Sequence, residues 1–325
     1  MPDGATFDQD HTLSFMFFQA FMETWFPGFF MWLAQRVLLS MSKKAFPNQP
    51  KSWKFDPTPT VATTPPLIVD KLYDLMISGW AEPVDNIQRV IGPKSIELTD
   101  GRLLNNIDSI IFCTGYDMVV PFLSGKHNPY DHAGAPPYLY RNIFPLHSDP
   151  DVRNSLAFVG HGAIPFPGFV QHELITMAIA QVWRGRSPLP PYEEMKAWHR
   201  RQLQWREERK AMQKQETTFY VAFVPFADSV RWLNWAAGAG IYEHFSWFSW
   251  RAWAFWWRDR AFYRKVKSGL FSPSIWRLFD MGKRKTWDGA KQTIYKDNEL
   301  ADRNKAKMAE ELKKKEEQNE SKKVV

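Results

Sequence analysis

The sequence predicts an α/β fold, on the evidence of two apolar strands and of the helix that follows the second strand. Residues 110–112 are typical of a buried strand, and this strand ends at Thr114 and Gly115, where backbone could approach a ligand closely. Residues 156–160 resemble a second buried strand. A glycine-bearing loop and a helix with apolar residues at helical spacing then continue to Gly185. Strand, loop and helix in this order have the geometry of a nucleotide-binding crossover.

Composition narrows the class of protein. The 325 residues, 44% hydrophobic and 24% charged, are typical of a globular chain with room for about two domains. The single cysteine, Cys113, excludes a disulfide scaffold and a cysteine-rich metal site, and it fits a reducing compartment. A net charge of +7 favours an anionic membrane surface or a polyanionic cofactor, and is weak evidence for nucleic acid. Residues 1–12 hold no Lys or Arg, so they lack the basic region of a secretory signal.

The first apolar segment, residues 13–41, predicts two short helices. Glu23, Pro27, Gly28 and Arg36 interrupt it, so neither half supplies the ~20 uninterrupted apolar residues that a membrane span needs. The break is expected at Pro27 and Gly28, because proline removes a backbone donor and glycine accepts the turn. The two helices either pack on the body as a hairpin or lie in a membrane interface.

An extended connection, rich in Pro, Thr and Lys, is expected over residues 47–66. A short helix should follow, capped by Asp70 and ending before Gly79. Residues 96–104 predict a β-hairpin, because the dipeptide Asp100-Gly101 tolerates the backbone angles of a tight two-residue turn.

The loop after the second predicted strand contains Gly160 and Gly162, but Pro165 stands where a dinucleotide fingerprint needs its third glycine. The chain also lacks a complete G-x-G-x-x-G, a Walker A sequence, H-E-x-x-H and G-x-S-x-G. His161 and His172 flank this loop without a third ligand at useful spacing, so we interpret them as loop histidines and expect no metal site.

The C-terminal half is aromatic and basic. Residues 245–257 read FSWFSWRAWAFWW, with arginines among and just after the rings. The stretch favours a membrane-interface helix, with core packing, a substrate-tunnel lining and self-association left open. The cluster Lys283, Arg284 and Lys285 could meet a phosphate but is more typical of solvated charges. Beyond Asp297 the Lys/Glu-rich chain predicts a solvated, partly helical or disordered tail.

Several segments, in order along the chain, resemble the flavin-containing monooxygenase family. The central one is IDSIIFCTGYDMVVPFL at residues 107–123, with Cys113 where the family usually has alanine. The resemblance covers about residues 11–297 and includes PPLIVDKLYDLMISG, DGRLLNNID, RNIFPLHSDP, LAFVGHGAIPFPGFVQHELITMAIAQVWRGRSPLPPYEEM and IWRLFDMGKRKTWDGAKQTI.

This resemblance implies an α/β, partial two-dinucleotide-binding-domain flavoprotein fold with a helical, aromatic-rich C-terminal extension. Residues 1–57 would be a helical segment of the NADPH-domain region, and 58–116 the end of that domain. Residues 117–297 would be the C-terminal part of the FAD domain with the aromatic helical region, and 298–325 a charged flexible tail.

The resemblance also implies the chemistry. FAD and NADPH would support O2-dependent oxygenation of small molecules at a soft nitrogen or sulfur, through a flavin C4a-hydroperoxide. The cofactor supplies that chemistry, and no catalytic residue of this chain can be named. Gly168 should begin a helix without a side-chain cap, leaving N–H groups that face the flavin. The residues expected at the cofactor are Thr114, Gly115, Tyr116, Gly160, Gly162, Gly168 and Gln171.

Members of the family carry two glycine-rich loops before the region where this chain begins. We therefore expect the chain to be truncated, to bind FAD weakly or not at all, and to be inactive alone. The alternative is a non-catalytic membrane-surface interaction protein that keeps the family's C-terminal fold. The family is often found at the endoplasmic reticulum membrane, which implies its cytosolic face, or otherwise the cytoplasm. Lys322 and Lys323 resemble a K-K-x-x retrieval signal, although a lysine-rich tail often places two lysines there by chance.

Overall fold

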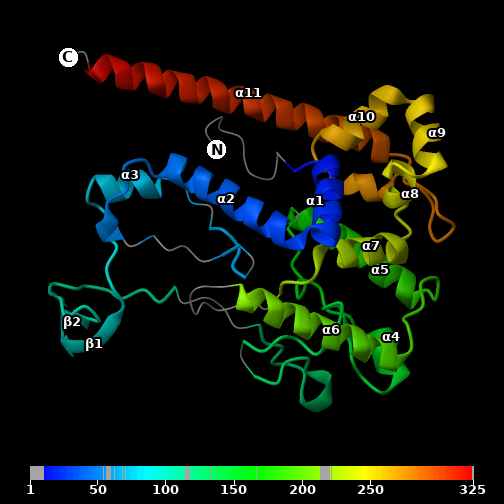
Figure 1. Cartoon of the computed structure of the whole chain (residues 1–325), viewed down its shortest axis with the longest axis horizontal. Helices are drawn as coiled ribbons and strands as arrows, with labels where there is room; N and C mark the ends of the chain where they lie inside the picture. Colours follow the sequence, from blue (N-terminus) through cyan, green and yellow to red (C-terminus); the bar gives the residue numbers. More distant parts are fainter. Residues whose placement is uncertain are drawn as a thin grey trace. The chain divides into compact units, whose positions relative to one another are not determined.

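The computed structural model describes residues 11–323 except 54, 56–59, 62, 68, 70, 114–117, 133, 166, 213–219 and 221, and describes only the backbone at 312 and 315–323. Figure 1 shows the course of the chain, which divides into two compact units. The larger unit comprises the residues up to Phe30, Val120–Trp205 and Val221 onward, and the smaller comprises Met31–Val119 and Arg206–Tyr220.

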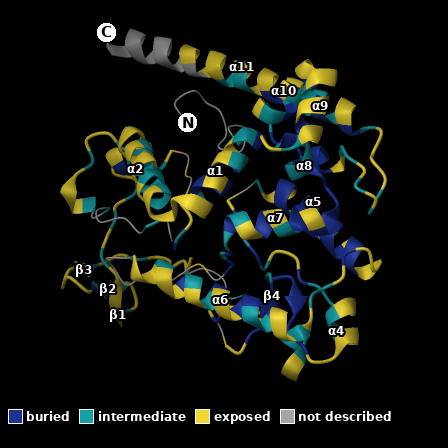
Figure 2. Cartoon of the chain, turned by 45° about the vertical axis from the view of Figure 1, so that its right-hand side comes forward, coloured by how far each residue is buried: buried dark blue, intermediate teal, exposed yellow. Residues whose placement is uncertain are grey.

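The larger unit is mainly helical. Its core lies where α5 packs against α7 and against the 3-10 helix η4, while α1 packs against α7 and α10. Figure 2 shows how much of α5 and α7 is buried. The elements are α1 Leu13–Trp25, η3 Gly125–His127, β4 Leu139–Tyr140, β5 Phe144–Pro145, α4 Pro150–Ser155, α5 Gly168–Trp183, α7 Phe226–Ala237, α8 Ile241–Phe245, α9 Trp250–Arg258, α10 Arg260–Ser268, η4 Pro273–Arg277 and α11 Ala290–Lys323.

The smaller unit contains a three-stranded antiparallel sheet in the order β1-β2-β3. Its elements are η2 Lys51–Trp53, α3 Leu72–Ile77, β1 Ile87–Gly92, β2 Ser95–Leu98 and β3 Leu103–Leu104. The chain passes between the units within α2, Pro27–Ala45, and within α6, Tyr192–Ala211. The described structure is thus mixed helix and sheet, as an α/β class requires.

The two predicted N-terminal helices are confirmed, and they break at Phe26, beside Pro27. Thr12 caps α1, because its side-chain oxygen accepts a hydrogen bond from the Phe15 N–H at 3.1 Å. The buried side of α1 includes Leu13 and Met16, so this helix packs on the body, whereas α2 buries none of its residues. Across the described parts of the chain, no helix combines the length and the hydropathy that crossing a bilayer demands.

Both predicted buried strands are wrong. Residues 107–113 form no strand, and Ile111 and Phe112 are more than 80% exposed. Residues 156–160 also lie outside any strand, although Phe158 is buried. A buried strand needs hydrogen-bonded neighbours on its edges. Among the described strands, none pairs with either segment, so hydrophobicity alone cannot make a sheet there.

The predicted hairpin at 96–104 is confirmed as β2 and β3, with Ile96 opposite Leu104. Its turn holds three residues instead of two. The Leu98 N–H donates to the Arg102 carbonyl at 2.9 Å, and Gly101, at φ +84°, donates back to the Leu98 carbonyl at 3.0 Å. This is the type of turn in which a glycine occupies the left-handed position at the end of the loop.

The short helix before this hairpin is confirmed as α3, and Gly79 follows its end at φ +77°. The proposed cap, Asp70, lies outside the described residues. Lys71 occupies the cap position and makes no side-chain capping bond.

The basic cluster at the C-terminal end of the body is not simply solvated. Lys283 Nζ donates to Ser187 Oγ and to the Trp235 carbonyl, both at 2.7 Å. Burial lowers the pKa of Arg284 to about 10, and its guanidinium donates to the carbonyls of Trp276 and Lys285. Lys283 and Arg284 therefore fasten the segment before α11 to the body.

The predicted charged tail is helical in the described residues, as the final turns of α11. This helix starts before the expected boundary, and its first turns are packed. Ile294, Asn298 and Ala301 are buried, and Asn298 Oδ1 accepts from the Leu270 N–H at 2.9 Å.

We predict that Gly238→Ala costs about 2 kcal/mol or more of unfolding free energy. Gly238 ends α7 at φ +63°, and an added Cβ would lie 2.9 Å from Cβ of Lys283. The matched control is Gly185→Ala after α5, at φ +68° with no atom within 4 Å of an added Cβ. It should cost only the conformational term of about 1 kcal/mol. Urea denaturation measures both, and equal losses would contradict the role of the close contact.

Candidate functional site

The candidate site is the loop of residues 156–167 together with the start of α5. Backbone hydrogen bonds fix the loop at two points, although it is not a strand. The Phe158 N–H donates to the Ile143 carbonyl at 2.8 Å, and the Ala163 N–H donates to the Ala222 carbonyl at 2.6 Å. Ala163 also forms an isolated parallel bridge with Phe223. The loop is therefore held between the β4–β5 hairpin and the segment before α7.

Gln171, one turn into α5, is buried and turned toward this loop. Its Nε2 donates to the Gly162 carbonyl, and its Oε1 accepts from the Ile164 N–H at 3.4 Å. Gly162 is confined by packing, since an added Cβ would lie 3.3 Å from Cβ of Asn142. In this structure both residues shape the loop from within.

Asn142 holds the same loop from the β4–β5 hairpin. It is fully buried and sits at φ +57°. Its Nδ2 donates to the His161 carbonyl at 2.8 Å, and its Oδ1 accepts from Gln202 Nε2 at 3.0 Å. Asparagine tolerates the left-handed conformation better than most residues, and both ends of its amide are used here.

Arg141, the neighbour of Asn142, anchors that hairpin. Its side chain is only 9% exposed and forms a two-pronged ion pair with the Asp228 carboxylate of α7, with N···O distances of 2.9 and 3.3 Å. The guanidinium carbon lies 4.9 to 5.3 Å from the ring centroids of Tyr140, Trp198 and Trp232. Such contacts are favourable when the cation is desolvated.

His161 pairs with Tyr130, whose hydroxyl lies 2.5 Å from Nδ1 of the imidazole. Burial lowers the pKa of His161 and raises the pKa of Tyr130 to about 12, so both groups favour their neutral forms. His172, in contrast, is exposed on α5. Within the described ranges, no three His, Cys, Asp or Glu side chains gather closely enough to hold a metal ion.

Two of the predicted cofactor residues, Gly160 and Gly168, have an exposed backbone with open space beside it. Gly160 has φ +89° and is exposed, and an added Cβ there would meet no atom within 4 Å. Gly168 begins α5 with the same open space, and no side chain caps the helix. The Pro167 cap position makes no side-chain capping bond, and the N-terminal N–H groups of this 16-residue helix favour an electron-rich ligand. Thr114, Gly115 and Tyr116 lie outside the described residues, so their predicted role stays a prediction.

Sequence reasoning missed the residues that hold the loop in place. Tyr130, Asn142 and Gln202 belong to no motif, and each acts through a contact with a residue at least 19 positions away. Arg141 and Asn142 do open the RNIFPLHSDP segment, so the family resemblance marked their position but not their function.

The loop is thus held by side chains behind it and exposes backbone at Gly160 and Gly168. The sequence model of the family described as flavin-binding monooxygenase-like matches residues 16–324. The chain therefore belongs to this flavin-binding family, which does not favour the alternative of a non-catalytic interaction protein.

Individual proteins that this chain resembles are also named as monooxygenases. The chain is 31% identical over 285 residues to monooxygenase aurF of Gibberella zeae, a match that covers 84% of this chain and 52% of that protein. It is 24% identical over 238 residues to dimethylaniline monooxygenase (N-oxide-forming) 4 of Oryctolagus cuniculus, with 72% and 38% covered. A third relative, flavin-containing monooxygenase FMO GS-OX-like 7 of Arabidopsis thaliana, is 36% identical over 114 residues, with 34% and 22% covered. The chain thus spans about half the length, or less, of these relatives.

We predict that acid destabilises the protein partly through His161. Its pKa is lowered in the folded state by burial, while the unfolded chain has the ordinary value of about 6.5. The unfolded state therefore takes up the proton first as the pH falls, and the free energy of unfolding should decrease below that value. His161→Gln should reduce this decrease without abolishing it, because burial also lowers the pKa of His244.

Urea denaturation at pH 7 and pH 5 measures the effect. The exposed His172→Gln serves as the control substitution. An unchanged pH dependence in His161→Gln would contradict the prediction.

Proposed function

We propose that this chain carries part of the cofactor site of an FAD- and NADPH-dependent monooxygenase that oxygenates soft nitrogen or sulfur atoms of small molecules. The observation that carries the proposal is the family match over residues 16–324, which contains the whole candidate site. The proposal places the chain in part of a fold with two dinucleotide-binding domains.

Among the predicted cofactor residues, the exposed glycines Gly160 and Gly168 are better placed to contact a flavin than the buried Gln171. Gly160 and Gly168 present exposed backbone with room beside it, and they would hold the flavin with the uncapped N–H groups of α5. Gln171 and Gly162 would not touch the flavin themselves, but their hydrogen bond would keep the loop in the conformation that does. When bound, the flavin supplies the activation of O2 and the delivery of one oxygen atom, while the protein binds, orients and excludes water.

The substrate class follows from the resemblance and is compatible with a relative's name. The rabbit relative is named for N-oxide formation on dimethylaniline, a tertiary amine. A soft nitrogen or sulfur lone pair accepts an oxygen atom without prior deprotonation, so such a reaction needs no strong base. Among the described residues of the site, the neutral His161 and Tyr130 pair provides none.

We predict weak FAD binding that depends on Gly160. The chain lacks the glycine fingerprint on which a pyrophosphate usually rests, so flavin should be lost on gel filtration yet be detected by fluorescence quenching in a titration. Gly160→Ala should weaken this binding several-fold, because a side chain would enter the open space and strain a backbone at φ +89°. Gly185→Ala, at the other end of α5 with a similar φ, should bind FAD like the wild type.

The same sample, with saturating FAD, NADPH and O2, tests the reaction on a tertiary amine and on a thioether. Little or no product is expected, because the chain is expected to be inactive alone, and any product that forms should carry one added oxygen atom and require all three components. Absence of flavin quenching in the FAD titration would refute the proposal.

For localisation, we infer the cytosolic face of the endoplasmic reticulum membrane. The family resemblance and the exposed tryptophans near α9 support this inference. Val324 and Val325, the end of the resembled retrieval signal, lie outside the described residues. A fluorescently tagged chain should coincide with a reticulum marker, and a uniform cytoplasmic distribution would contradict the inference.

A further inference from the structure

An exposed aromatic surface surrounds α9. Its five outer rings are between 57% and 101% exposed, where large apolar side chains of a soluble protein are normally scattered singly. Figure 2 shows the exposed residues along this part of the chain. The five residues, here called the tryptophan surface, are Trp247, Phe248, Trp250, Trp253 and Trp257.

These rings are not needed for the core. Trp250, Trp253 and Trp257 follow helical spacing and form one stripe along α9. The helix buries its other side through Ala252 and Phe255. Phe255 alone makes ring contacts with Phe245, Phe262, Tyr263 and Phe279, at centroid distances of 5.4 to 6.1 Å. The tryptophan stripe is therefore additional to the packing that holds α9 in place.

Cations lie directly on this surface. The Arg260 guanidinium lies 4.1 Å from the Trp256 ring centroid and 5.0 Å from that of Trp257. Lys267 Nζ lies 4.9 Å from the Trp247 ring centroid. Residues 247–268 contain six basic residues and a single acidic one, Asp259. The Asp259 carboxylate is already paired with Lys291 at 2.6 Å, so it does not offset the positive surface.

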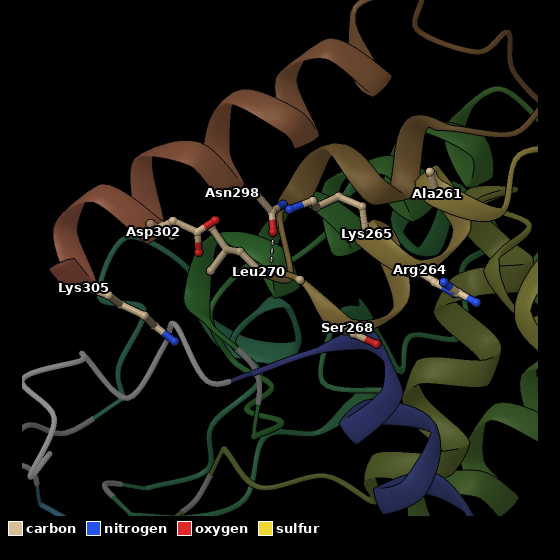
Figure 3. Close-up of a pocket in the computed structure, with 10 residues that line it drawn as sticks. Ala261, Arg264, Lys265, Ser268, Leu270, Asn298, Asp302 and Lys305 are labelled. Carbon is tan, nitrogen blue, oxygen red and sulfur yellow. Dashed lines mark hydrogen bonds between the residues drawn. The ribbon is translucent and has the colours of Figure 1, made fainter.

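A polar pocket adjoins the same face of α10. Arg260 and Arg264 are four residues apart, which places them on one side of the helix. Arg264, Lys265 and Ser268 line a pocket of about 380 Å³ between α10 and α11, and Lys305 and Asp302 line it from α11 (Figure 3). Lysine, arginine and hydroxyl groups around an open pocket suit a phosphate-bearing headgroup.

We propose that the tryptophan surface and the basic face of α10 dock on an anionic phospholipid bilayer, with one headgroup in the α10–α11 pocket. Tryptophan suits the boundary between headgroups and acyl chains because its ring is apolar and its N–H is polar. Arginine and lysine then meet the phosphates. A second copy of the chain is a poorer occupant, because self-association would bring two positively charged surfaces together.

Vesicle co-sedimentation of the full chain tests this proposal. Wild type should bind vesicles of phosphatidylcholine with 30% phosphatidylserine at least about tenfold more tightly than phosphatidylcholine alone, and raised salt should weaken the binding. The triple variant Trp250→Ser, Trp253→Ser, Trp257→Ser should lose binding to both. The variant Arg260→Gln, Arg264→Gln, Lys265→Gln should lose the preference for phosphatidylserine.

The matched control changes exposed rings elsewhere on the same unit. Phe18→Ser, Phe21→Ser on α1 removes two aromatic residues that are 46% and 54% exposed and lie outside the tryptophan surface, and it should leave vesicle binding unchanged. Circular dichroism confirms that each variant is folded.

A second measurement needs no variant. Vesicles that carry brominated acyl chains should quench part of the tryptophan fluorescence of the wild type, because rings in the interface lie close to bromine. Lack of quenching, lack of co-sedimentation, or equal losses in the α1 control would overturn the proposal. A dimer that depends on the three tryptophans and does not bind vesicles would also overturn it and would identify a second copy as the occupant.

Discussion

The desolvated guanidinium of Arg141 is the contact on which the candidate site depends. Three elements meet around it: the β4–β5 hairpin, α6 through Trp198, and α7 through Asp228. Asp228 also accepts a hydrogen bond from Trp198 Nε1 at 2.8 Å, so one carboxylate connects two of these elements. The ion pair and the surrounding rings hold the hairpin in a conformation with two consecutive positive φ angles, which an unsupported loop would avoid.

The β4–β5 hairpin in turn fixes the position of the loop before α5. Asn142 is fixed beside Arg141 and bonds the His161 backbone, while Gln171 bonds the loop from the opposite side. The loop is thus shaped by side chains from the β4–β5 hairpin and from α5, although it forms no strand of its own. Rigid support behind a loop with exposed glycines is a common way to keep backbone N–H groups ready for a ligand.

The sequence predicted what local chemistry determines and failed where distant partners decide. Proline at position 27, glycine after α3, the Asp100-Gly101 turn and the periodicity of α5 act within a few residues, and each was located correctly. A buried strand at residues 110–112 needs neighbouring strands that a local pattern does not specify. The support from Asn142 likewise depends on partners 19 and 60 positions away, and the family resemblance marked only its position. Gln171 turns inward to Gly162 and Ile164, nine and seven positions before it, a choice that helical periodicity does not specify.

The long helix α11 is attached to the body at one end. Its buried stripe runs through Ala290, Ile294 and Asn298 and, among the residues with described side chains, ends at Ala301. From there to Lys323 the helix spans about 33 Å at 1.5 Å per residue. The packed part of α11 is therefore short, and the part that extends beyond it is long. A rotation of about 4° at its anchor, which also forms one wall of the α10–α11 pocket, becomes a displacement of about 2 Å at the far end.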